Sequence, residues 1–134
     1  MGLLVDTSVW SLLLRRDRPR DVREVRALAD ALRGGERILS TGLILQELLQ
    51  GFSGPKARQQ LSERFAAFPL LNPDRRDHIA AAELRSRCRK RGIQAGTIDA
   101  LLAQLCIRHE LVLLTTDADF IHIAKHTSLA LWNR

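Results

Sequence analysis

Aromatic residues are scarce in this chain, which has four phenylalanines, two tryptophans and no tyrosine among its 134 residues. A protein that binds single-stranded nucleic acid by stacking needs a platform of exposed rings for the bases. The composition therefore excludes a broad base-stacking surface. Any contact with a nucleic acid would depend on the backbone and the shape of the strand.

Cysteines and long apolar runs are equally scarce. The two cysteines, Cys88 and Cys106, lack the clustered spacing of a zinc site or a disulfide framework, and we interpret them as reduced thiols in or near the core. No apolar run approaches the roughly 20 residues that a membrane-spanning helix requires. The first residues lack the basic segment and the long apolar core of a secretory signal. We therefore predict a cytoplasmic protein without a membrane segment.

Positive charge is what the chain has in excess. It carries 21 lysines and arginines against 15 acids, a formal net charge of +6. This balance favours a polyanionic partner, because basic side chains release counterions when they neutralise phosphates. The candidates for contacts with an RNA backbone are Arg15, Arg16, Arg18 and Arg20, with a second basic stretch at 85–91. A solvated surface is the alternative interpretation of both stretches.

Short apolar segments alternate with amphipathic segments along the whole chain. At 134 residues, this pattern predicts one α/β domain spanning residues 1–134. We expect a mainly parallel central sheet with helices on both faces, in three α/β/α layers. The predicted strands are 3–5, 37–40, 70–71, 111–114 and 129–132, and the predicted helices are 8–14, 21–32, 42–50, 55–65, 74–91, 97–108 and 119–125.

Helical spacing also predicts which side chains face the core. In the segment 21–32, Leu28 and Leu32 lie on one apolar stripe. In the segment 74–91, we expect Ile79, Ala82 and Leu84 near the core. In the segment 97–108, the predicted apolar face is formed by Ile98, Leu101, Leu102, Leu105 and Cys106.

Four acids occupy positions from which they can meet. Asp6 and Asp117 follow predicted strands, and ligands bind outside the carboxyl ends of the strands of an open parallel sheet. Glu47 lies in a helix among leucines and isoleucine, in unusually apolar company, so it needs a partner. Asp99 lies near the start of its helix. Each acid alone also fits a plainer role as a helix cap or as half of an ion pair.

Carboxylates that converge repel one another, and burying them without compensation is costly. A divalent cation removes this conflict. Ligation by oxygen alone suits Mg²⁺ or Mn²⁺, whereas zinc favours histidine and cysteine clusters that the sequence lacks. We therefore predict a Mg²⁺ or Mn²⁺ site.

Four segments, in order along the chain, resemble the motifs of PIN-domain nucleases, and most closely those of VapC-type toxins from type II toxin–antitoxin pairs. The segments are Leu4-Val-Asp-Thr-Ser-Val-Trp10, Thr41-Gly-Leu-Ile-Leu-Gln-Glu-Leu48, Ile98-Asp-Ala-Leu-Leu-Ala103 and Leu113-Leu-Thr-Thr-Asp-Ala-Asp-Phe120. The resemblance implies metal-ligand and catalytic roles for Asp6, Glu47, Asp99 and Asp117, and supporting roles for Thr7, Ser8, Thr115 and Asp119.

The same resemblance implies an activity and partners. The expected activity is endoribonucleolytic cleavage of tRNA or ribosomal RNA by metal-activated water, leaving a 5′-phosphate and a 3′-hydroxyl and inhibiting growth. The expected partners are a small VapB-type antitoxin, which inserts a segment over the acidic site, and a second copy of the chain in a homodimer or a larger assembly.

Two other classes of function remain to be distinguished. A PIN fold can grip RNA or a protein without cutting it, although the presence of all four acids favours catalysis. A phosphatase of the haloacid-dehalogenase type also begins with a strand followed by Asp. That family needs a second acid two residues later, where this chain has Ser8.

Overall fold

The computed structural model describes residues 2–14 and 22–133. Within them the strands are β1 (Leu3–Val5), β2 (Ile38–Thr41), β3 (Leu70–Leu71), β4 (Val112–Leu114) and β5 (Ala130–Leu131). The helices are α1 (Thr7–Leu14), α2 (Arg23–Gly34), α3 (Gly42–Gln50), α4 (Pro55–Phe65), α5 (Arg75–Lys90), α6 (Thr97–Arg108) and α7 (Asp119–Lys125). The predicted elements are thus all present, with ends shifted by at most two residues.

The ends of the helices follow local chemistry. Thr41 caps α3, because its hydroxyl oxygen accepts a hydrogen bond from the Ile44 N–H at 3.1 Å. Pro55 opens α4, where its missing N–H leaves no helical bond unmade. Gly35 ends α2 in the left-handed region, with φ of 69°, which favours a residue without a Cβ. No helix among the described residues is long and apolar enough to cross a membrane.

The five strands form one parallel sheet in the order β3-β2-β1-β4-β5. Strand β1 lies at the centre, where Leu4 pairs with Leu39 of β2 on one side and with Leu113 of β4 on the other. A central strand is covered on both faces, which explains why the whole of β1 is apolar and buried. The end of β1 is therefore enclosed by β2 and β4.

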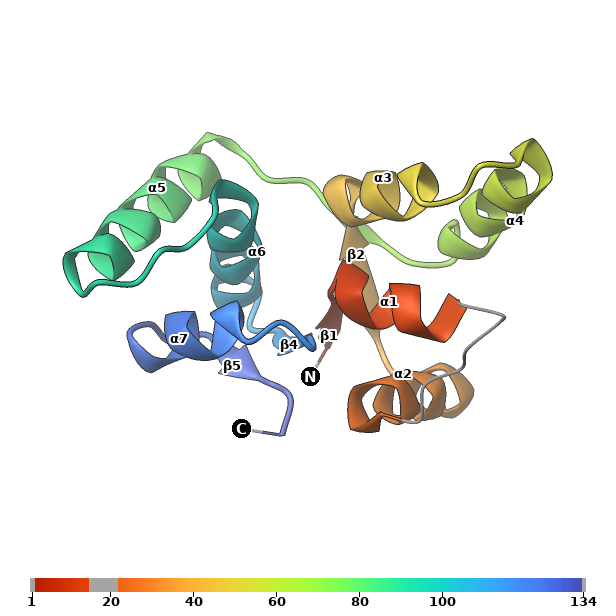
Figure 1. Ribbon diagram of the computed structural model, residues 1–134, viewed down its shortest axis with the longest axis horizontal. Helices are drawn as coiled ribbons and strands as arrows, with labels where there is room; N and C mark the ends of the chain where they lie inside the picture. The colour runs from red at the N-terminus through yellow and green to blue at the C-terminus, as the bar shows by residue number, and fades with distance from the viewer. Residues whose placement is uncertain (1, 15–21, 134) are drawn as a thin grey trace.

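The helices lie in two layers, one on each face of the sheet. From β1 the chain moves outward through β2 to β3, and α1–α4 connect these strands. The chain then crosses to β4 and β5, on the other side of β1, by way of α5–α7. Right-handed crossovers in opposite directions place their helices on opposite faces. Figure 1 shows α1–α4 on one side of the strands and α5–α7 on the other, which confirms the predicted three-layer arrangement.

The core joins both layers to the sheet. An aromatic group made of Trp10, Phe65 and Phe68 fastens α1 against α4 and the segment that follows it, with ring centroids 4.9–5.5 Å apart. Both cysteines are buried, as predicted. The largest fully buried side chains are Phe120, Leu4, Leu28, Ile44, Leu84, Leu102, Leu105, Leu111, Leu113, Leu114, Ile123 and Val5.

Four of the predicted core positions were wrong. Ile79 is 55% exposed, and Leu32 and Ile98 are 40% and 43% exposed; Ala82 is exposed as well. The buried face of α5 is instead formed by Asp77, Ala81, Leu84 and Cys88. An aspartate on the core side of a helix breaks the apolar stripe, and the sequence pattern therefore assigned the wrong face.

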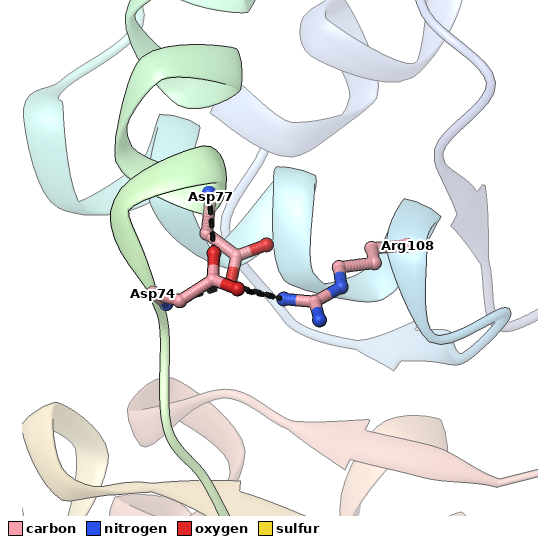
Figure 2. Close-up of polar contacts among 3 residues, drawn as sticks. All are labelled: Asp74, Asp77 and Arg108. Atoms are coloured by element: carbon pink, nitrogen blue, oxygen red, sulfur yellow. Dashed lines mark hydrogen bonds and ion pairs between the residues drawn. The ribbon is translucent and has the colours of Figure 1, made fainter.

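Asp77 is buried because it closes a polar junction between α5 and α6. Its Oδ2 accepts hydrogen bonds from Nη1 of Arg108 and from the Asp74 N–H, the latter at 2.9 Å. Asp74 in turn accepts from the Asp77 N–H at 3.0 Å, which completes a capping box at the start of α5. Figure 2 shows Arg108 reaching from α6 to both acids. The backbone N–H of Asp77 holds the pKa of Asp74 below its usual value, with a further lowering by the Arg108 charge.

Replacing Asp77 by alanine should lower the free energy of unfolding by about 2 kcal/mol, because the change removes a cap and a partly buried charged hydrogen bond. Urea unfolding followed by circular dichroism measures the loss. The control is Asp30→Ala, which breaks an ion pair with Arg33 whose side chains are 71% and 74% exposed. That variant should lose less than about 0.5 kcal/mol. Equal losses in the two variants would contradict the structural role of the junction.

Candidate active site

Four elements deliver acids to one edge of the sheet. Asp6 directly follows β1, and the segment from Thr115 to Asp119 follows β4. Because the two strands are parallel neighbours, their carboxyl ends lie side by side. Helix α6 runs back into β4, so its first turn, which holds Asp99, lies at the same edge. Glu47 lies on α3, the helix that begins where β2 ends.

Asp6 is 9% exposed and is held by three donors. Its Oδ1 accepts from the Thr7 N–H at 2.8 Å. Its Oδ2 accepts from the hydroxyls of Ser8 at 3.0 Å and Thr115 at 2.8 Å. A carboxylate with three hydrogen bonds has little freedom to rotate, and the bonds satisfy it in a poorly hydrated place. The orientation of Asp6 is therefore fixed before any ligand binds.

The same hydroxyls connect β1 to the loop after β4. Thr115 Oγ1 accepts from the Asp117 N–H at 3.0 Å while its own proton goes to Asp6. Ser8 Oγ accepts from the Thr116 N–H at 3.2 Å. These two short side chains thus set the distance between Asp6 and the loop that carries Asp117. The sequence identified both residues, but only the structure shows that they join the two strand ends.

Three acids make the tightest group. Asp99, Asp117 and Asp119 each offer a carboxylate oxygen, and these oxygens lie within 4.8 Å of one another. Opposite ligands of an octahedral Mg²⁺ are about 4.2 Å apart, so the group is close to the size of a magnesium site. Asp117 Oδ1 also accepts from the Asp119 N–H at 2.9 Å, which ties the two acids of the loop together. Asp119, expected to be auxiliary, therefore belongs to the same group as Asp99 and Asp117.

The pKa of Asp99 is affected by all the other acids of the site. Burial, and after it the charges of Asp117, Asp6, Asp119 and Glu47 in that order of importance, together raise the pKa of Asp99 from 3.8 to about 6. The four other carboxylates therefore lie within electrostatic reach of Asp99. Such a pocket attracts a cation, because a positive ion removes both the burial cost and the repulsion.

The surroundings of Glu47 differ from those that the sequence predicted. Its side chain is exposed rather than enclosed by the neighbouring leucines. The partner that the sequence demanded is Thr7, whose hydroxyl donates to Glu47 Oε1 at 3.2 Å. Since the Thr7 N–H binds Asp6, residue 7 connects Glu47 to the buried acid. Glu47 therefore lies at the solvent-facing rim of the site.

The donor set contains only oxygen. Burial, with a smaller contribution from the charge of Asp6, raises the pKa of the Cys106 thiol to about 12. This disfavours the thiolate, which is the form that binds metals. Carboxylate oxygens without sulfur or imidazole fit Mg²⁺ or Mn²⁺.

A groove runs beside the acids on the side of α1, α3 and α4, with a volume of about 1000 Å³. Glu47 lines it, so the groove reaches the rim of the site. Its wall is mainly apolar, with two cations, and includes Leu13, Leu14, Leu48, Phe52, Lys56, Ala57, Leu61 and Arg64. The predicted RNA-binding residues Arg15, Arg16, Arg18 and Arg20 lie outside the described residues.

Replacing Asp99 by asparagine should stabilise the metal-free protein at pH 7.5 by about 1–2 kcal/mol, after allowance for solvent screening. The folded-state pKa of about 6 exceeds the ordinary 3.8, so ionisation of Asp99 costs the folded state more than the unfolded state. The advantage of the variant should be absent below pH 4, grow between pH 4 and 6, and stay constant above. Thermal unfolding in the presence of a chelator measures it.

The matched control is Glu83→Gln, which removes an exposed carboxylate from α5. This change should leave the pH dependence of unfolding as in the parent protein. An advantage of the asparagine variant that is the same at pH 4 and pH 7.5 would show that repulsion and burial of the Asp99 charge are not its cause.

Comparison with known proteins places the chain in a family. The PIN domain family model matches residues 3–126. The chain is 33% identical over 129 residues to the VapC ribonuclease Mb1587 of Mycobacterium bovis and to ribonuclease VapC11 of Mycobacterium tuberculosis, with 95% of each chain covered. In FitAcB from Neisseria gonorrhoeae a chain superposes with a TM-score of 0.74 at 25% identity, covering 98% of this chain and 96% of that one. In VapBC2 from Rickettsia felis, bound to a promoter DNA fragment, the TM-score is 0.75 at 18% identity, with 98% and 97% covered. The chain described here belongs to the PIN domain family.

Proposed function

We propose that the chain is a metal-dependent endoribonuclease and the toxin of a type II toxin–antitoxin pair. The observation that carries this proposal is the convergence of Asp6, Glu47, Asp117 and Asp119 on Asp99, with carboxylate oxygens of Asp99, Asp117 and Asp119 within 4.8 Å of one another. A structural role does not require so many like charges in one place, because each adds repulsion. The curated relatives, 33% identical over almost the whole chain, are named ribonucleases, which supports RNA as the substrate.

The proposed chemistry divides the work among the acids. Asp99, Asp117 and Asp119 would hold the cation, Asp6 would support it from the buried side, and Glu47 would complete the site at the rim. When bound, Mg²⁺ or Mn²⁺ activates water for in-line attack on a phosphodiester and neutralises charge on the leaving oxygen. Ser8 and Thr115 keep Asp6 and the loop after β4 in register. The products are a 5′-phosphate and a 3′-hydroxyl.

The alternative of a non-catalytic PIN module receives less support. A module that only grips RNA gains nothing from a pocket of repelling carboxylates beside the phosphates. A phosphatase of the haloacid-dehalogenase type is also disfavoured, because Ser8 uses its hydroxyl to donate to Asp6 where that chemistry needs a second acid.

Purified chain free of any partner should cleave RNA with Mg²⁺ or Mn²⁺. Asp99→Asn and Asp117→Asn should each lower kcat/KM by about 100-fold or more, because each removes a charged ligand. Thr115→Val should lower it by about 10-fold, since the change only releases Asp6 and the loop. Sequencing of the RNA ends identifies the site of cleavage and the terminal groups.

The control Glu83→Gln keeps the net charge change of the asparagine variants and lies outside the site, so it should cleave like the parent chain. RNA that is bound but never cleaved in the presence of either metal would favour the non-catalytic module. Cleavage that persists in both asparagine variants would place the catalytic centre elsewhere.

The proposal extends to a small antitoxin of the VapB type. The solved complexes FitAB, VapBC2 and VapBC-1 contain chains with this fold, with TM-scores of 0.73–0.75. The groove between α1, α3 and α4 is of the size and apolar character that suit a peptide segment, and it leads to Glu47. An antitoxin segment in this groove would pass over the acids and block them. We place the pair in the cytoplasm, where its RNA substrates are.

Ala57→Glu should weaken binding of the antitoxin encoded with this chain by about 10-fold or more, because it puts a charge into the apolar wall of the groove. Ser62→Glu, on the same helix but facing another hollow, adds the same charge and should bind normally. Calorimetry measures the affinity, and light scattering of the same samples tests the expected homodimer and larger assembly. Equal affinities in both variants would remove the groove as the docking site.

A further inference from the structure

One basic side chain of the stretch 85–91, that of Arg85, makes a hydrogen bond within the described part of the fold. Five of the seven residues of this stretch are arginine or lysine. Arg85 directs its Nε–H to the backbone carbonyl of Ala95, with a distance of 2.8 Å in a partly buried setting. The acceptor lies ten residues further on, in the turn between α5 and α6. Arg85 therefore fastens the end of one helix to the chain that begins the next.

The turn it holds leads directly to the acidic site. Ala95 is 4% exposed, and Gly96 is the residue before the first turn of α6. An ideal Cβ on Gly96 would lie 3.8 Å from Oδ2 of Asp99, so the Asp99 carboxylate folds back over this backbone. A shift of the turn would shift the acid with it.

Helix α6 lacks a local means of fixing its start. Thr41 and Asp74 cap α3 and α5 with side-chain hydrogen bonds, whereas Gly96 has no side chain to do so. Beyond the first helical bond, from the Ala100 N–H to the Gly96 carbonyl at 2.9 Å, the polar contact at this end is the one from Arg85. The carboxylates around Asp99 repel it. This repulsion pushes on the first turn of α6, which therefore needs a contact that holds it in place.

We propose that Arg85 is a positioning residue, which holds the Ala95 carbonyl and thereby sets the place of the Asp99 carboxylate in the acidic cluster. It touches neither substrate nor metal and acts through the backbone of the turn. The inference rests on the proposed function only in so far as the cluster binds a cation.

The test compares Arg85→Gln with Arg87→Gln. Both variants remove one positive charge from the exposed surface of α5, and only the first removes the contact with Ala95. Arg85→Gln should weaken Mn²⁺ binding, measured by calorimetry, by about 10-fold, the lower end of the loss when a supporting residue behind a metal ligand is removed. Hydrogen exchange of the amides of 97–100 should quicken. Arg87→Gln should match the parent chain in both measurements.

Arg85→Lys is a second test variant, to be used if Arg85→Gln folds poorly. Lysine keeps the charge but offers a differently placed donor, so it should restore the fold and recover only part of the Mn²⁺ affinity and of the exchange protection. In RNA cleavage at saturating Mn²⁺, the two glutamine variants should show the same change in KM, because they remove the same charge.

Two results would overturn the inference. If Arg85→Gln raises KM for RNA much more than Arg87→Gln while Mn²⁺ affinity and exchange stay unchanged, Arg85 contacts the substrate instead. If both glutamine variants weaken Mn²⁺ equally, the effect is one of overall charge. Should the parent chain cleave no RNA at all, the proposed function fails, while Mn²⁺ binding and exchange still decide the role of Arg85.

Discussion

Repulsion among buried carboxylates is the constraint on which the arrangement of this domain depends. Asp6 is almost fully buried, and Asp99 is raised to a pKa of about 6 by its own burial and by four neighbouring acids. A polypeptide can tolerate such a cluster only where hydrogen bonds or positive ends of dipoles compensate it. For Asp6 the compensation is three donors from Thr7, Ser8 and Thr115. For Asp99 it includes the N-terminus of α6, which favours a negative side chain in its first turn by about 0.3–1 kcal/mol.

The parallel sheet makes this cluster possible because it brings the carboxyl ends of its strands to one edge. Strand β1 is central, so the residue that follows it is flanked by the ends of β2 and β4. Strands of three or four residues are sufficient, since the sheet has only to bring three carboxyl ends to one edge. The aromatic contacts of Trp10 with Phe65 and Phe68 then hold α1 in place. Thr7 and Ser8 belong to the first turn of that same helix, so the packing of Trp10 helps to fix the donors that stabilise Asp6.

Local rules made the elements predictable, and with them the positions of Asp6, Asp99 and Asp117 at one edge of the sheet. Short sequence signals predict where elements begin and end to within a few residues. Examples are the apolar run before Asp6, the Gly-Pro before α4 and the acid after β4. What escaped prediction depends on contacts between distant segments. Ile79 follows the helical period yet is exposed, because Asp77 occupies the core face of α5 to meet Arg108. The apolar residues next to Glu47 in the sequence predict that it is enclosed. In the structure, the leucines point to the core and Glu47 lies at the rim of the site. The closeness of Asp119 to Asp99 is set by the loop after β4, whose shape no periodicity encodes.

Helices α5 and α6 show how an acid is placed more accurately than packing alone allows. Arg108 ties the end of α6 to the start of α5, and Arg85 ties the end of α5 to the turn before α6. Apolar contacts along the pair tolerate small sliding motions, because burial changes little with a shift of a fraction of an ångström, whereas hydrogen bonds are steep in distance and angle. Two such bonds at opposite ends make α6 a rigid support for Asp99. Since an acid repelled by its neighbours moves wherever its support yields, the geometry of this site depends on polar contacts made outside it.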